Sequence, residues 1–187
     1  MKPKVIVILG ATSTGKSDLA VLLATTIFKK KAEIISADSR QVYKGLDLGT
    51  GKITKKEMRG IPHHLLDVVN PKKTFTVTEF KKLADKKIKQ ILVRGNVPIL
   101  CGGTGFYIDT VVNNVVFPEV PPNEELRKKL EQKNKEELFE ILEKLDQQRA
   151  KDIKDKNELN NKVRLIRAIE IATSLGNVPK ITEGNPM

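Results

Sequence analysis

Residues 5–17 read Val5-Ile-Val-Ile-Leu9 and then Gly10-Ala-Thr-Ser-Thr-Gly15-Lys16-Ser17, and no other stretch of the chain constrains its architecture as strongly. The first five residues are a continuous apolar, β-branched run, which is typical of a strand buried in a parallel sheet. The next eight match G-x-x-x-x-G-K-[ST], the phosphate-binding P-loop motif, which needs a strand before it and a helix after it. Leucines at helical spacing follow Ser17 and predict that helix.

The motif predicts a site for a di- or triphosphate. Its glycines let backbone N–H groups turn inward around an anion, and the start of the helix adds a partial positive charge. Lys16 supplies a full positive charge, and the Ser17 hydroxyl is a candidate ligand for Mg²⁺ bound to the phosphate oxygens. The predicted phosphate-binding residues are Gly10, Ala11, Thr12, Ser13, Thr14, Gly15, Lys16 and Ser17. The motif alone does not say which phosphate compound binds.

The chain up to residue 117 alternates between strand and helix patterns. A short strand at 34–35 follows the first helix, and Thr76 with Glu79 forms a capping box that opens another. A third strand, 97–101, ends in the glycine turn 102–105 and leads to a further apolar helix. This alternation predicts an α/β fold, a P-loop NTPase-like parallel sheet with helices on both faces. A spatial order with the third strand in the middle would leave the P-loop strand as an open edge, which is a pairing hazard.

Composition shifts at the proline-rich residues 117–122, where we place a domain boundary. Residues 1–117 form the predicted P-loop core domain, and residues 118–187 a mostly helical appended segment. Asn134 and Glu137 predict a helix cap there, and Gly176 a helix end. The predicted apolar helix positions are Leu126 and Leu130, then Leu138, Leu142 and Leu145, and finally Leu159, Val163, Ile166 and Ile169.

Charge and composition narrow the class of protein. The 187 residues are 39% hydrophobic and 30% charged, which is globular composition, and no apolar run is long enough to span a membrane. A single cysteine, Cys101, excludes a disulfide framework. The net charge of +11 lies entirely in residues 1–117, which hold 20 Lys/Arg against 9 Asp/Glu. We expect a cytoplasmic protein, and the basic segment favours a nucleic acid or a phosphorylated small molecule unless it reflects lysine-rich composition alone.

The rest of the predicted phosphate site lacks one usual part. A P-loop NTPase commonly has a strand that ends in a magnesium-binding aspartate, whereas the strand at 97–101 ends in Gly102 and Gly103. The carboxylate that does follow a strand is Asp38. It is a candidate general base for an incoming nucleophile, an outer ligand of Mg²⁺, or merely a turn cap.

Five blocks together make the chain similar to a known family. They are Gly10-Ala-Thr-Ser-Thr-Gly-Lys-Ser17, Ile35-Ser-Ala-Asp-Ser-Arg-Gln-Val-Tyr-Lys-Gly-Leu-Asp-Leu-Gly-Thr-Gly-Lys52, Gly60-Ile-Pro-His-His-Leu-Leu-Asp67, Pro98-Ile-Leu-Cys-Gly-Gly-Thr-Gly-Phe-Tyr107 and Arg164-Leu-Ile-Arg-Ala-Ile-Glu170. In this order they resemble the tRNA dimethylallyltransferases (tRNA isopentenyltransferases) of the bacterial type. The blocks extend over residues 5–180, and the second is highly specific.

The resemblance implies a P-loop that holds the diphosphate of dimethylallyl diphosphate. The family transfers the dimethylallyl group to N6 of the adenine 3′ of the anticodon in tRNA and releases diphosphate. By position, Thr12 to Ser17 would hold the diphosphate with Mg²⁺, Asp38 would accept or orient the N6 proton, and Thr104 would hydrogen-bond near the leaving diphosphate. The implied tRNA contacts are Asp38, Ser39, Arg40, Gln41, Arg164 and Arg167.

The chain departs from the family pattern at its end. Family members continue well beyond the block that ends at Glu170, whereas this sequence stops at residue 187. Three hypotheses therefore stand: a tRNA prenyltransferase, a non-catalytic remnant that binds diphosphate or RNA, and a P-loop small-molecule kinase that binds ATP. We expect a monomer without a membrane partner.

Overall fold

The computed structural model describes residues 5–179 and 182–183. After Val116 the chain passes from one compact unit to a second, Phe117–Thr182, and Glu183 belongs to the first unit again. No helix in the described ranges is long and apolar enough to cross a membrane.

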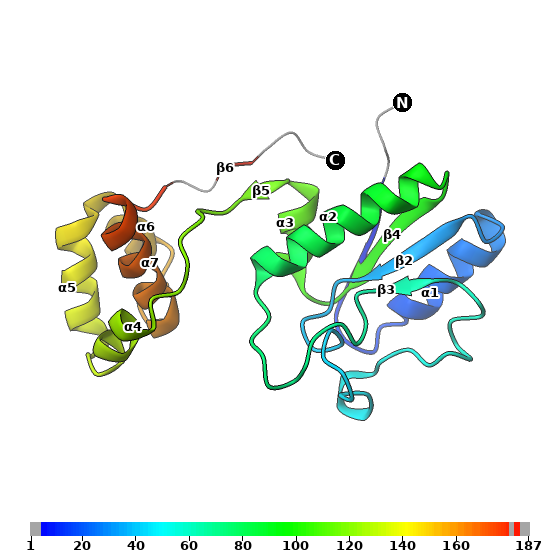
Figure 1. Ribbon diagram of the computed structural model, residues 1–187, viewed down its shortest axis with the longest axis horizontal. Helices are drawn as coiled ribbons and strands as arrows, with labels where there is room; N and C mark the ends of the chain where they lie inside the picture. Colours follow the sequence, from blue (N-terminus) through cyan, green and yellow to red (C-terminus); the bar gives the residue numbers. More distant parts are fainter. Residues whose placement is uncertain (1–4, 180–181, 184–187) are drawn as a thin grey trace. The chain divides into compact units, whose positions relative to one another are not determined.

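The first unit is a parallel sheet with helices on both faces, which confirms the predicted fold class (Figure 1). Within residues 5–179 the sheet has four strands in the order β1-β4-β2-β3, all pairs parallel. Strand β1, which carries the P-loop, therefore lies at an edge, as it would in the one strand order considered from the sequence. Strand β3 was not predicted from the sequence pattern. The elements of this unit are β1 (Ile6–Leu9), α1 (Lys16–Leu22), the π-helical turn η1 (Leu23–Ile27), β2 (Ala32–Ser36), the 3-10 turn η2 (Leu48–Thr50), β3 (His63–His64), α2 (Val77–Val93), β4 (Val97–Gly102), α3 (Gly105–Val112) and β5 (Val115–Val116).

One face of the sheet is covered by α2 and α3 (Figure 1). The capping box that opens α2 is formed as predicted, with Glu79 N donating to Thr76 Oγ1 at 3.2 Å and Thr76 N donating to Glu79 Oε2 at 2.8 Å. Phe80 of α2 is fully buried and stacks on Tyr107 of α3, with ring centroids 4.1 Å apart. The start of α2 and the start of α3 are thereby fixed against each other.

The other face is covered by α1 and η1, and the contact that they make differs from the sequence pattern. The fully buried residues are Ala20 and Ala24, whereas Leu19 and Leu22 keep 47% and 49% of their surface exposed. Small side chains let a helix approach the sheet closely, which leaves the longer leucines at the flanks of the contact. A helix after the P-loop was predicted correctly, but the spacing of the leucines did not identify the side of the helix that packs against the sheet.

The second unit is helical. Its helices are α4 (Glu124–Glu131), α5 (Lys135–Leu145), α6 (Gln147–Asp155) and α7 (Lys162–Leu175), of which α6 was not predicted. The Asn134–Glu137 capping box opens α5 as expected, and Gly176 ends α7 with φ 82°. Val163 was predicted to be buried, and this is wrong, because α7 begins only at Lys162 and presents Leu165, Ile166 and Ile169 to the core, leaving Val163 79% exposed. A two-stranded sheet pairs β5 with β6 (Thr182–Glu183).

Candidate functional site

The P-loop connects the end of β1 to the start of α1 through backbone that bends back on itself. Ser13 and Gly15 have positive φ angles of 62° and 79°, and Leu19 N donates to the Gly15 carbonyl at 3.0 Å as the first helical bond. A side chain is strained at the φ of Gly15, which explains the glycine there. Inside the loop, Thr14 Oγ1 donates to the Ala11 carbonyl at 2.8 Å, and Lys16 Nζ donates to the same oxygen. The Lys16 ammonium therefore lies within the concavity that the motif predicts for an anion.

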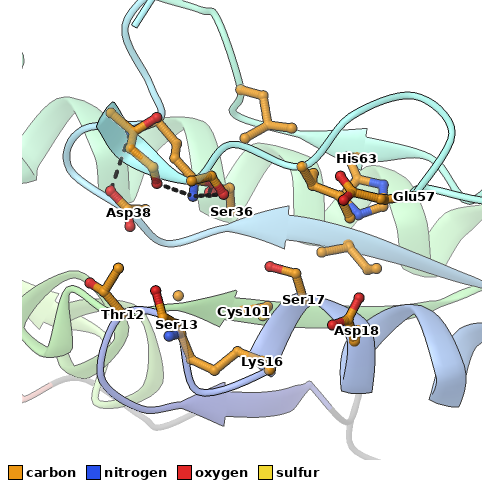
Figure 2. Close-up of a pocket in the computed structure, with 18 of the residues that line it drawn as sticks. Thr12, Ser13, Lys16, Ser17, Asp18, Ser36, Asp38, Glu57, His63 and Cys101 are labelled. Carbon is orange, nitrogen blue, oxygen red and sulfur yellow. Dashed lines mark hydrogen bonds between the residues drawn. The ribbon is translucent and has the colours of Figure 1, made fainter. Parts of the chain in front are cut away.

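Asp38 lies on the loop that follows β2 and faces the P-loop across the pocket, opposite Thr12 (Figure 2). Its Oδ1 accepts hydrogen bonds from Arg40 N at 2.8 Å and Gln41 N at 3.3 Å. The carboxylate thus caps a turn, which was one of the three roles considered from the sequence. The capping bonds also fix the orientation of the carboxylate toward the pocket. The two roles are compatible, because a capping bond occupies one oxygen of the two.

The glycine turn after β4 supports the Asp38 loop. Thr104 Oγ1 accepts from Ser39 N at 3.0 Å, and Thr104 N donates to the Ala37 carbonyl at 3.1 Å. Gly102 lies so close to this loop that an added Cβ would come within 2.1 Å of the Ala37 oxygen. Thr104 therefore holds the residue next to Asp38, and Gly102 makes room for the loop.

These elements surround a cavity of about 220 Å³. Eight of the residues predicted for the site line it, namely Thr12, Ser13, Thr14, Gly15, Lys16, Ser17, Asp38 and Gln41. Gly10, Ala11, Ser39, Arg40 and Thr104 belong to the supporting backbone and loops rather than to the lining. Arg164 and Arg167 lie on α7 in the second unit. The structure thus brings together the phosphate loop and Asp38 from segments more than 20 residues apart.

The cavity also contains side chains that sequence reasoning did not assign to it. Asp18, Glu57 and His63 form its other end, as Figure 2 shows, and Ile34, Ile53, Leu66 and Cys101 supply apolar lining. His63 belongs to the sequence block 60–67, but the block by itself did not assign it to the cavity. Asp18 and Glu57 gave no signal, because acidic residues at a helix start and in an exposed loop are common.

His63 presents a hydrogen-bond acceptor to this end of the cavity. Its Nδ1 is 2.8 Å from the Ile61 carbonyl oxygen, so Nδ1 carries the hydrogen. Burial lowers the pKa of His63, which favours the neutral ring, and Nε2 is buried without a partner among the described residues. Burial likewise raises the pKa of the Cys101 thiol to about 11, consistent with a core cysteine rather than a nucleophile.

The IPP transferase family matches residues 41–185, which is most of the chain. The chain belongs to this family. It is 45% identical over 171 residues to a tRNA dimethylallyltransferase of Anoxybacillus flavithermus, covering 91% of this chain and 53% of that protein. A tRNA dimethylallyltransferase of Staphylococcus epidermidis is 44% identical over 176 residues, covering 90% of this chain and 51% of that one. The resemblance derived from the five sequence blocks is therefore confirmed.

Solved structures place the fold in the same group. The tRNA isopentenylpyrophosphate transferase of Bacillus halodurans matches with a TM-score of 0.61 and 39% identity, covering 94% of this chain and 57% of that one. A eukaryotic dimethylallyltransferase acting on tRNA matches with a TM-score of 0.77 and 32% identity, covering 97% and 46%. This member of the IPP transferase family spans about half the length of the curated relatives it matches.

Proposed function

We propose that this chain acts in tRNA modification by prenyl transfer. Its substrates would be dimethylallyl diphosphate and the adenine 3′ of the anticodon, whose N6 receives the dimethylallyl group while diphosphate leaves. The observation that carries the proposal is that a P-loop and the Asp38 carboxylate line one cavity in a chain of this family. A kinase needs the same loop, but the family match gives no support to it.

The residues divide the reaction between them. The P-loop amides and Lys16 would bind the diphosphate, where negative charge grows as the bond between C1 and the diphosphate oxygen breaks. The adenine amine would form the new bond to C1, and Asp38 would take the proton that N6 loses. Oδ1 of Asp38 accepts hydrogen bonds from two backbone N–H groups, so Oδ2, which makes none of the hydrogen bonds described above, would be the oxygen that takes the proton.

Magnesium would be bound at this site mainly by the oxygens of the diphosphate and not by a cluster of protein ligands. The described residues contain no group of three or more His, Cys, Asp or Glu side chains placed to hold a metal ion. Mg²⁺ commonly keeps several waters and binds phosphate oxygens with one or two protein ligands. The Ser17 hydroxyl, which points into the cavity in Figure 2, would be such a ligand. When bound, Mg²⁺ supplies charge neutralisation for the diphosphate.

Contacts with tRNA would come from both units. Ser39, Arg40 and Gln41 adjoin Asp38, where an extruded adenine must lie because its amine is out of reach inside a base stack. On α7, Arg164 is paired with Glu158, and Arg167 donates to Glu170 and to the Val120 carbonyl. The side chains of Arg164 and Arg167 keep 45% and 35% of their surface exposed, so donors that these pairs leave unused would reach a phosphate. Cytoplasmic tRNA is the substrate we expect.

The test is transfer of labelled dimethylallyl diphosphate to unmodified tRNA in the presence of Mg²⁺, with ATP hydrolysis measured in parallel. We expect label in the tRNA from the wild-type chain and a loss of at least about a hundredfold in rate for Asp38→Asn, the usual scale for a general base. The control is Asp155→Asn, which changes an exposed carboxylate of α6 and leaves transfer unchanged.

Two results would contradict the proposal. Binding of the prenyl diphosphate without transfer would identify the chain as a non-catalytic remnant. Hydrolysis of ATP without label in the tRNA would instead favour the kinase.

A further inference from the structure

Lys52 is a lysine whose charged end is buried against three oxygen atoms. Its side chain is only 6% exposed, and Nζ lies 2.6 Å from Asp67 Oδ1, 2.7 Å from Asp47 Oδ1 and 3.0 Å from the Tyr43 carbonyl oxygen. Burial alone would lower the pKa of Lys52, but the bonds to Asp47 and Asp67 outweigh it and raise the pKa. The ammonium is therefore charged, and all three of its hydrogens are used.

The three oxygens come from two loops, because Tyr43 and Asp47 lie in the connection between β2 and β3 and Asp67 follows β3. A few backbone bonds also join these loops. Asp67 N donates to the Gln41 carbonyl at 3.2 Å, and Lys44 N donates to the Val69 carbonyl at 2.9 Å. Asp47, the third partner of Lys52, lies in residues 44–52, the same loop as Lys52. Lys52 thus fastens two points of the connection between β2 and β3, Tyr43 and Asp47, to the segment after β3.

The same loop positions the side chain of Gln41. Gln41 Nε2 donates to the carbonyl oxygens of Thr50 and Gly51 at 3.1 and 3.3 Å, and Gln41 Oε1 accepts from Ser36 Oγ at 3.3 Å. Thr50 and Gly51 directly precede Lys52 in the chain. The carboxamide orientation at the cavity therefore depends on where residues 50–52 are held.

Lys52 itself does not line the cavity, although its neighbours do. Gln41, Thr50, Gly51, Ile53 and Leu66 all line it, and they belong to the two loops that Lys52 joins. The P-loop lies on the opposite side of the cavity and makes none of the contacts of Lys52 described above. Loss of this lysine would loosen one wall of the cavity and leave the phosphate loop intact.

We propose that Lys52 is a positioning residue for the tRNA substrate, which acts by holding the loops that orient Gln41 and the wall around it. The inference rests on the proposed function, because it assigns this wall to the adenine and the P-loop to the prenyl diphosphate. Removal of Lys52 leaves two partly exposed carboxylates, Asp47 and Asp67, which repel each other and reach water. The expected result is a displaced loop rather than an unfolded protein.

The experiment compares the full chain with Lys52→Met, Lys52→Arg and the control Lys56→Met, which removes an exposed lysine from the following turn. We expect Lys52→Met to raise the KM for tRNA about tenfold, while the KM for dimethylallyl diphosphate stays within about twofold. Lys52→Arg keeps the charge and restores part of the tRNA affinity. Equal KM values for Lys52→Met and the control, or an equal rise for both substrates, would overturn the proposal.

Hydrogen exchange separates this inference from the proposed function. In Lys52→Met the amides of Lys44 and Asp67 should exchange about tenfold faster, while those of β2 and β4 are unchanged. If the wild-type chain transfers no prenyl group, the proposed function fails, and unchanged exchange at these amides would then refute the positioning role as well. Should Lys52→Met fail to fold, Asp67→Asn, which removes only one partner, must show the same selective rise in the KM for tRNA.

Discussion

Replacement of Gly102 by alanine adds only one methyl group, but it should distort the cavity strongly. Gly102 ends β4, and a Cβ there would lie 2.1 Å from the Ala37 oxygen, 2.3 Å from the Ala37 carbonyl carbon and 2.8 Å from its Cα. All three atoms belong to backbone, so no flexible side chain can move away. To reach ordinary contact distance, the Ala37 peptide must shift by more than about 1 Å.

Ala37 is held through both its N–H group and its carbonyl oxygen. Ala37 N donates to the Cys101 carbonyl at 2.8 Å, and the Ala37 oxygen accepts from Thr104 N at 3.1 Å. The shift breaks at least one of these bonds and adds overpacking, which together place Gly102→Ala at about 3 kcal/mol of lost stability. Asp38 follows Ala37 directly, so the displaced peptide should also lower the prenyl-transfer rate.

Urea unfolding followed by circular dichroism measures the loss of stability. The matched control is Gly105→Ala, at the start of α3, because a Cβ at Gly105 would meet no atom within 4 Å and alanine favours a helix. Gly105→Ala should therefore equal or slightly exceed the wild type in stability. A Gly102→Ala protein that unfolds at the same urea concentration as Gly105→Ala would refute the steric argument.

Two further predictions concern buried carboxylates. Glu170, 1% exposed, accepts bidentate bonds of 2.9 Å from Arg127 and a further bond from Arg167. Because the two arginines are each about a third exposed and can gain water, Glu170→Ala should cost about 2–3 kcal/mol in urea unfolding of the second unit, and a loss below about 1 kcal/mol would contradict this. Burial alone would raise the pKa of Glu33, but hydrogen bonds led by Arg94 lower it to about 2. The pKa of Glu33 in the folded protein therefore lies below its value in the unfolded chain, which contributes about 3 kcal/mol to the stability above about pH 5. This contribution should be lost as the pH falls toward 2, and Glu33→Gln should remove the pH dependence.

The parts of the fold that the sequence predicted are those set by local chemistry. The P-loop and the two capping boxes at Thr76 and Asn134 depend on residues within a few positions of each other, and all three are formed. The P-loop strand was likewise evident from its unbroken apolar run. In each case the signal comes from residues that are close together in the sequence.

The parts that sequence reasoning missed depend on distant partners. The strand β3 has only two residues, and it exists because Ile34 and Ile35 of β2 pair with them. His63 enters the cavity through this pairing, and Lys52 is buried because Asp67 lies across from it. The amino-acid type alone predicts neither the cavity position of His63 nor the burial of Lys52, since most lysines are exposed.

The position of β1 at the edge of the sheet has a consequence for the order of folding. Among the described strands β1 pairs with β4 alone. The backbone of Ile6 can therefore join the sheet only after its partner, Ile99, has been synthesised. At a synthesis rate of roughly 5–20 residues per second, this delay is on the order of 5–20 seconds on the ribosome. The phosphate-binding loop is thus translated well before the strand that anchors it can become part of the sheet, since that step requires β4 to have emerged.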